Sequence, residues 1–193
     1  MPLARIRQYP LVESFKTLQD AEEALRKLTA VLQEEATKRT EDFRTEHIAT
    51  LMKARAYLSA NQTNITDTTW TKVLLDSESY DPGNHFASYK YTVTVPGSYL
   101  IHGQIRVDDT DLVADKSYTG GIKINGTTYV VCSEIIPPVG GVLPTIPLIG
   151  IHPLDVDDYI EMHFHHDAGN NNIDIYGAAG GYSTFMEVHL LST

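Results

Sequence analysis

The stretch from Tyr91 to Val107 constrains the fold of this chain more than any other stretch. Apolar side chains alternate with more polar ones from Tyr91 to Val95 and again from Tyr99 to Val107. Because strand side chains point to opposite faces with a period of two, each run predicts a strand with one buried face. Pro96 lacks an amide donor and is followed by Gly97, so the turn between the strands belongs there. The stretch therefore predicts an antiparallel β sandwich.

After Ala56 the residue preferences turn from helical to β, and the remainder is predicted to be strands and turns. The predicted strands are Trp70–Leu75, Tyr89–Val95, Ser98–Val107, Gly120–Ile124, Thr127–Cys132, Tyr159–His165, Asn172–Tyr176 and Thr184–Leu191. Asn125-Gly126 is a strong hairpin signal between two of them. The segment Ile135–Pro153 carries five prolines and three glycines, and is predicted to be a long apolar loop.

The segment before the strands predicts a helix. Its heptad core positions hold apolar residues, namely Leu18, Ala21, Leu25, Leu28 and Leu32. This seam spans only about two and a half heptads, so alone it would form a marginal coiled coil. We expect the helix to continue toward Lys53, with a break around Thr37–Asp42 as the alternative. The predicted organisation is an extended arm over 1–12, a helical stalk over 13–53 and a β domain over 54–193.

The net charge of the chain restricts the classes of molecule that it can bind. The chain has 15 Lys and Arg against 25 Asp and Glu, a formal charge of −10, which argues against phosphate neutralisation and nucleic-acid binding. Met1–Pro10 lacks the apolar core of a secretory signal, and no apolar run can span a membrane as a helix. Cys132 lies in an apolar run and is predicted to be a buried, inert thiol. We expect a soluble protein without membrane insertion.

The β half resembles the trimeric jelly roll shared by the complement component one-q globular heads and the tumour necrosis factor ligands. The segments that carry the resemblance are Ala54–Tyr57, Trp70–Val73, Tyr80–Asn84, Val95–Tyr99, Lys123–Gly126, Leu154–Met162 and Ser183–Leu190. The sequence departs from the family where Asp157-Asp158 replaces the usual glycine-aspartate, and no collagen repeat precedes the domain. The resemblance implies a mainly β fold, an antiparallel jelly-roll sandwich that assembles as a homotrimer.

A short helical stalk in place of collagen, behind an arm bracketed by Pro2 and Pro10, resembles bacteriophage virion proteins such as tail, collar or head fibres. This resemblance implies a location in the virion, an arm that binds other virion proteins, and an outward knob that contacts host-surface carbohydrate or protein. One alternative is a purely structural head-decoration or collar protein. The others are a tumour necrosis factor-like signalling ligand and a hydrolase, although the sequence contains no glycine-flanked serine elbow and no HExxH, CxxC or Walker motif.

Aromatic, amide and apolar residues of the predicted loops are the candidates for receptor binding. They are Tyr118, Val139, Val142, Leu143, Asn171, Tyr176 and Tyr182. Aromatic and amide side chains suit carbohydrate or protein recognition, and a long apolar loop offers an adhesive surface. The alternatives are burial of the apolar loop against neighbouring subunits and asparagines that merely form turns.

Glu161, His163 and His165 share one face of a predicted strand. Imidazole and carboxylate groups at alternate positions suit zinc or nickel, and a three-fold axis would triplicate any ligand near it. The alternative is a hydrated or interfacial polar face. The sequence otherwise predicts no cofactor, so a structural divalent cation is the one candidate.

Overall fold

The computed structural model describes residues 18–108, 112–137 and 144–193, without the side chains of Thr45 and Ala49. Two compact units divide the chain, Met1–Thr45 and Glu46–Thr193. The predicted arm and the start of the predicted stalk, at 1–17, lie outside the described residues.

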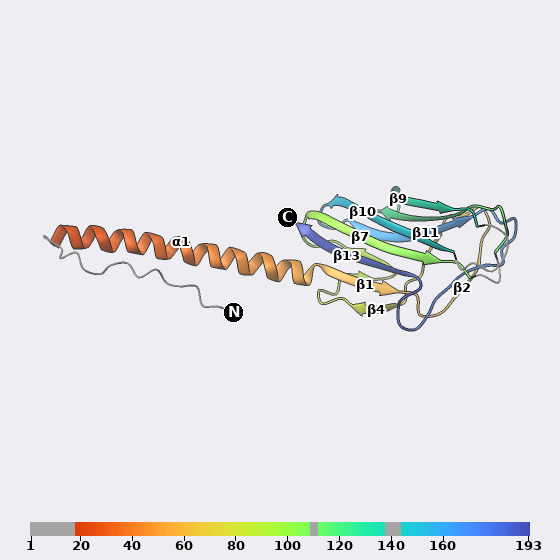
Figure 1. Ribbon diagram of the computed structural model, residues 1–193, viewed down its shortest axis with the longest axis horizontal. Coiled ribbons are helices and arrows are strands. Elements are labelled where there is room, and N and C mark those ends of the chain that lie inside the picture. Colours follow the sequence, from red (N-terminus) through yellow and green to blue (C-terminus); the bar gives the residue numbers. More distant parts are fainter. Residues whose placement is uncertain (1–17, 109–111, 138–143) are drawn as a thin grey trace. The chain divides into compact units, whose positions relative to one another are not determined.

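One unbroken helix, α1, covers Leu18–Leu51 (Figure 1). It contains neither proline nor glycine, and it is rich in alanine, leucine, glutamate, lysine and arginine, which favour helices. The prediction of a continuous helix is confirmed over these residues, so the alternative break at Thr37–Asp42 does not occur. The apolar seam is open to solvent in the single chain, because Leu18 is 81% and Leu25 is 64% exposed.

The last turn of α1 belongs to the second unit. Ile48 and Leu51 pack against the core of the β domain, and the amide of Leu190 donates to the carbonyl of Met52 at 3.0 Å. The compact β unit therefore begins with helix residues, a few positions before the boundary at 53/54 that the sequence suggests.

Two antiparallel sheets form the β domain. The five-stranded sheet has the order β10 (Thr145–Leu154), β7 (Gly97–Arg106), β13 (Phe185–Ser192), β1 (Lys53–Tyr57) and β4 (Ser77–Tyr80). The second sheet has the order β5 (Phe86–Ala87), β6 (Lys90–Thr92), β11 (Tyr159–His166), β8 (Tyr118–Ile124) and β9 (Thr128–Ile135), with β3 (Thr71–Lys72) also paired to β11. A small third sheet pairs β12 (Ile173–Ile175) with β2 (Gln62–Ile65).

The core lies between the sheets, as the alternating pattern predicts. Along β7 every second side chain is buried, including Tyr99, Ile101 and Ile105, while the intervening side chains are only half-buried. Residues of β11 such as Ile160 and Phe164 meet them from the other sheet and are also fully buried. The prediction of an antiparallel jelly-roll sandwich behind an N-terminal helix is confirmed.

The prediction of a long loop over Ile135–Pro153 is wrong, because Thr145–Leu154 forms the ten-residue strand β10. This strand lies at the edge of its sheet and pairs only with β7, so Pro147 and Pro153 can occupy positions whose nitrogen faces away from the ladder. Residues 138–143 lie outside the described part of the chain.

Cys132 also differs from its prediction, because it is an exposed free cysteine. It lies on β9 directly opposite Gly121 of β8, whose Cβ direction points toward Tyr129 and Trp70, so the Cys132 side chain points to the outward face of its sheet. Among the described residues, no helix has the length and apolar character to cross a membrane.

Candidate functional site

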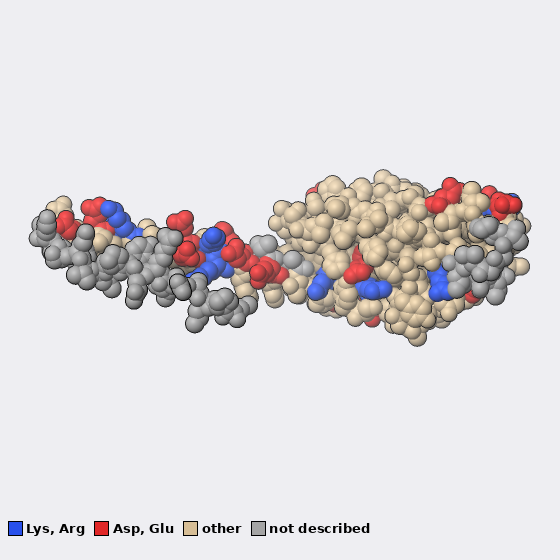
Figure 2. All heavy atoms as spheres, viewed as in Figure 1, with Lys and Arg blue, Asp and Glu red and all other residues tan. Residues whose placement is uncertain are grey.

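The outward side of the five-stranded sheet is the first candidate surface, and we call it the five-stranded face. Its members are the side chains that alternate away from the core on β10, β7, β13, β1 and β4, including Ile149, Ile151, Leu100, His102, Gln104, Phe185, Glu187, His189, Leu191, Lys53, Arg55, Tyr57 and Tyr80. In the view of Figure 1, uncharged side chains cover most of the surface over these strands (Figure 2).

Apolar residues are exposed on this face to an unusual degree. Ile149 and Ile151, on the edge strand β10, are 66% and 61% exposed, and Leu191 on β13 is 53% exposed. The register places Ile149 beside His102 and Ile151 beside Leu100, so the apolar side chains continue from β10 onto β7. A contiguous apolar patch of this kind is typical of a protein–protein contact surface.

A polar cluster crosses the middle of the face. The hydroxyl of Tyr80 donates to the carboxylate of Glu187, and Nε2 of His189 lies 2.8 Å from Oε1 of the same carboxylate. Nδ1 of His102 approaches Oε2 of Glu187 at 3.8 Å from the other side. One carboxylate therefore receives partners from β4, β7 and its own strand.

Arg55 completes the cluster. Its guanidinium lies 4.0 Å from the centre of the Phe185 ring, and its Nη2 donates to the carbonyl of Gly181 at 2.7 Å. This cation–π contact links the Arg55 side chain of β1 to the Phe185 ring of β13.

The electrostatics of the cluster fix its protonation at neutral pH. Burial acts to raise the pKa of Glu187, but the hydrogen bonds from Tyr80 and His189, with the nearby charges of His189 and Arg55, lower it overall. Burial and the hydrogen bond to Glu187 raise the pKa of Tyr80. Glu187 is therefore an ionised hydrogen-bond acceptor and Tyr80 a neutral donor at neutral pH.

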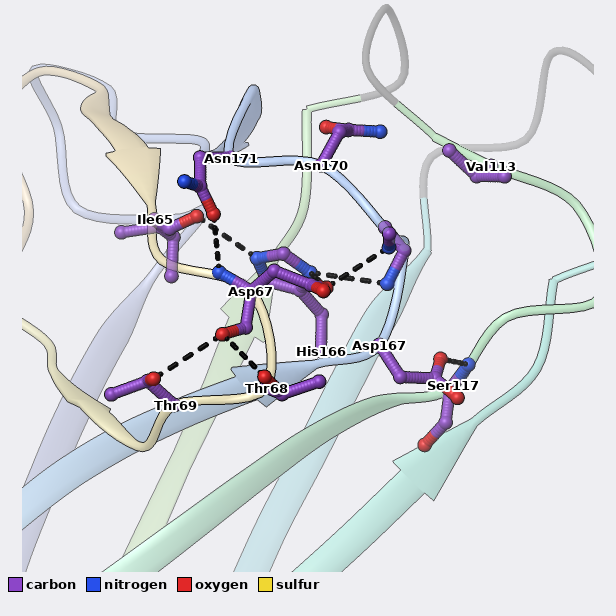
Figure 3. Close-up of polar contacts among 12 residues, drawn as sticks. Ile65, Asp67, Thr68, Thr69, Val113, Ser117, His166, Asp167, Asn170 and Asn171 are labelled. Carbon is purple, nitrogen blue, oxygen red and sulfur yellow. Dashed lines mark hydrogen bonds and ion pairs between the residues drawn. The ribbon is translucent and has the colours of Figure 1, made fainter.

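The loops that follow β2 and β11 contain a second polar cluster (Figure 3). The imidazole of His166 is fully buried, with Nε2 at 3.0 Å from the carbonyl of Ile65 and Nδ1 at 3.3 Å from the amide of Ala168. Asp67 accepts the amide of Gly169 at 3.0 Å, and its own amide donates to Asn171 at 2.7 Å. These bonds tie the segment after β2 to the segment after β11.

The predicted receptor-binding residues are not equivalent in the structure. Tyr118 is fully buried, stacks near Phe164 and His166, and exchanges hydrogen bonds with the backbone of Val113. Its prediction as a receptor contact is therefore corrected: the ring is part of the core, and its hydroxyl positions a loop. Val139, Val142 and Leu143 lie outside the described residues.

The other three predicted receptor-binding residues lie on or near the surface. Asn171 is exposed but uses its side-chain oxygen for Asp67, and Tyr176 is half-buried, with the Arg106 guanidinium 4.8 Å from its ring centre. Tyr182 is 63% exposed. Their receptor role stays a prediction, and Tyr182 offers more free surface than the other two.

The predicted metal ligands are not assembled as a site. Among the described residues, no group of three or more His, Cys, Asp or Glu side chains could hold a metal ion. Glu161 instead forms an ion pair with Lys72 at 2.7 Å and lies 3.4 Å from Nε2 of His163. The ring of His165 packs against Trp70 at 5.3 Å. Lys72 contacts Oε1 of Glu161 and His163 contacts Oε2, so the described residues of the single chain assemble no metal site. A site that three chains share at a three-fold axis stays a prediction.

Sequence reasoning missed the polar cluster of the five-stranded face. His102, Glu187 and His189 occupy outward positions of predicted strands, which is the one signal that the sequence carries. Their convergence with Tyr80 depends on strand order and register, because β1 separates β4 from β13 in the sheet.

No protein-family model and no curated protein sequence matches this chain. Solved structures do resemble it. Murine APRIL at pH 5.0 superposes with a TM-score of 0.53 at 12% identity, over 72% of this chain and 98% of that chain. The globular domain of zebrafish complement 1qA gives a TM-score of 0.53 at 9% identity, over 72% and 97% of the two chains.

The structure of Eiger TNF from S. frugiperda also has a TM-score of 0.53, at 11% identity, over 73% of this chain and 92% of that chain. Identities this low bear on the fold alone. The β domain therefore has the jelly-roll fold of the complement one-q globular domain and of the tumour necrosis factor ligands.

Proposed function

We propose that this chain is a non-enzymatic, homotrimeric virion protein, a bacteriophage tail or head fibre or receptor-binding protein whose jelly-roll knob contacts the host surface. The observation that carries the assembly is the five-stranded face. Ile149, Ile151 and Leu191 leave a large apolar area in water in the single chain, and burial against copies of the same chain would remove that cost.

The helix supports the same assembly. Its exposed leucines, including Leu25 and Leu32, form a seam too short for a stable isolated coiled coil. When the β domains of three chains associate, their helices are held at a high effective concentration, which stabilises the short seam. Helix and β domain would therefore assemble together.

The chemistry of the face favours docking over catalysis. Tyr80, Glu187 and His189 hydrogen-bond one another, and Glu187 is ionised at neutral pH with a lowered pKa. A neutral tyrosine next to an ionised, fully engaged carboxylate supplies hydrogen bonds across an interface but no activated nucleophile.

Two measurements test the proposal. Light scattering on the full chain should give three times the chain mass of 21.5 kDa, and a monodisperse monomer would overturn the assembly. A labelled antibody should locate the protein on purified phage particles, and its absence from the particles would overturn the virion role. Binding of the purified protein to host cells then separates a receptor-binding knob from a head-decoration or collar protein, which would bind no cells.

A further inference from the structure

The second sheet, which contains β8, β9 and β11, carries an aromatic shelf on its outward side. We define this shelf as Trp70 and Tyr129. Their ring centres lie 4.4 Å apart with an interplanar angle of 37°, and the ring of His165 extends the row at 5.3 Å from Trp70. Trp70 and Tyr129 are both half-buried, so part of each ring remains open to solvent. Trp70 comes from the segment before β3 and Tyr129 from β9.

Gly121 on β8 provides the space for the shelf. A Cβ atom at this position would lie 2.9 Å from two ring carbons of Tyr129 and 3.2 Å from Cζ3 of Trp70. Both rings therefore lie against the backbone of β8, in a space that any larger residue would fill. The shelf depends on a glycine in the middle of a sheet, where glycine otherwise weakens the strand.

Charged and polar groups border the shelf. Nζ of Lys123 lies over the Tyr129 ring, 4.7 Å from its centre, and the ring of His163 approaches Tyr129 edge-on at 6.2 Å. His163 in turn lies beside the Lys72–Glu161 ion pair. Nδ1 of His163 and the hydroxyl of Tyr129 are buried without a hydrogen-bond partner among the described residues, a deficit that a buried water would offset.

This combination matches the chemistry of a sugar ring. A pyranose presents an apolar C–H face, which stacks on aromatic rings, and a polar rim of hydroxyls, which pairs with ammonium, carboxylate and imidazole groups. A stable protein interface would need about 800 Å² per partner around an apolar centre, whereas two rings bordered by Lys72, Lys123 and Glu161 offer a smaller and more polar site. The formal charge of −10 argues against a nucleic acid that stacks its bases there.

We infer that the shelf of Trp70 and Tyr129 binds a pyranose unit of a glycan. The inference deepens the proposed function, on which its biological setting rests, by naming the chemistry of the host-surface ligand. The shelf lies on the other sheet of the sandwich from the five-stranded face.

The sequence offers an internal reporter, because Trp70 is the single tryptophan of the chain. The full-length protein is titrated with a panel of oligosaccharides built from glucose, galactose, mannose and N-acetylglucosamine, while tryptophan emission and acrylamide quenching are recorded. At least one oligosaccharide should shift the emission and shield Trp70 from the quencher. Tyr129→Ala should then raise its Kd about tenfold, a factor that corresponds to about 1.4 kcal/mol.

Two further variants sharpen the test. Gly121→Ala keeps both rings but displaces them, and it should weaken binding as well. Phe43→Ala removes an exposed aromatic ring from helix α1, which contributes no residue to the shelf, and should bind like the wild type. Circular dichroism and thermal unfolding confirm that each variant is folded.

An unchanged Trp70 signal across the whole panel, or equal binding by wild type and folded Tyr129→Ala, would overturn the inference. Light scattering on the same samples keeps the two hypotheses separate. A trimer that binds no oligosaccharide rejects the glycan site alone, whereas a monomer that binds one through Tyr129 rejects the trimer and leaves the glycan site standing.

Discussion

The hydroxyl of Tyr80 on the edge strand β4 donates a hydrogen bond to the carboxylate of Glu187 on β13, across the intervening strand β1. Arg55 of β1 lies between them in the register and places its guanidinium over Phe185. Three strands that are distant in sequence are thereby cross-linked on their outward side, in the centre of the proposed interface.

Replacement of Tyr80 by phenylalanine should lower the free energy of unfolding by about 1 kcal/mol, since Glu187 loses one charge-assisted hydrogen bond. The pKa of Glu187 is lowered from its ordinary value of 4.5. Its stabilising contribution is therefore present above about pH 4.5 and is lost as the pH falls through the lower, folded-state value. Urea unfolding at pH 7 and pH 3 measures both effects. The difference between the two proteins should be smaller at pH 3 than at pH 7, and an equal difference at both values would contradict the assignment.

A charge in the apolar part of the five-stranded face should dissociate the assembly. Ile151→Lys places an ammonium at a position that is 61% exposed in the single chain, so the fold should tolerate it. In a trimer the same ammonium would be buried against a neighbouring chain without a partner, at a cost of several kcal/mol. Light scattering should show a shift from trimer toward monomer at micromolar concentration.

Val156→Lys is the matched control for this substitution. Val156 is 50% exposed, but it lies in the turn between β10 and β11 rather than on the five-stranded face. It should leave the oligomeric state unchanged. Equal dissociation by both variants would place the interface elsewhere.

Much of the fold follows from local patterns in the sequence. Strict alternation predicts β7, and the Asn125-Gly126 turn predicts the pairing of β8 with β9. The sequence does not predict β10, because Pro147 and Pro153 lack the amide hydrogens that a central strand needs. Prolines at these positions are compatible with an edge strand, which is where β10 lies. Whether a strand lies in the centre or at the edge of a sheet depends on the strand order, which a single sequence does not reveal.

The candidate sites are less predictable than the fold for the same reason. Tyr118 and Tyr129 are both aromatic residues on neighbouring strands, yet Tyr118 is part of the core and Tyr129 belongs to an outward shelf. The face to which each side chain points depends on its register within the sheet. The shelf also needs Gly121 below it and Trp70 beside it, two residues that only tertiary contacts bring together.

His166 should be required for the order of the loops that it joins. His166→Phe preserves volume but removes the hydrogen bonds to Ile65 and Ala168, leaving buried backbone groups unpaired at a cost of about 1–3 kcal/mol each. Hydrogen exchange should show faster exchange at Ala168 and Gly169, while amides in β7 keep their protection. Asn171→Ala, which removes only one acceptor at the same loop, should have a smaller effect. Equal effects would assign the order of the loop to Asp67 instead.

We expect His163 to make the folded chain less stable in acid, whereas the sequence suggests that it holds a metal ion. Burial lowers the pKa of His163 from 6.5; the hydrogen bond and charge of Glu161 oppose this effect, while the charges of Lys123 and Lys72 add to it. The unfolded chain therefore takes up a proton at a higher pH than the folded chain, so stability falls as the pH drops below about 6.5, by at most about 1.4 kcal/mol per pH unit for one proton.

His163→Phe should flatten this dependence between about pH 6.5 and 5, whereas His165→Phe should retain it. A chelator should change neither profile, because Lys72 already occupies the Glu161 carboxylate. Thermal unfolding of the three proteins across this pH range measures the slopes. A wild-type slope that survives in His163→Phe would mean that another histidine takes up the proton, and a loss of stability with the chelator would restore the metal hypothesis.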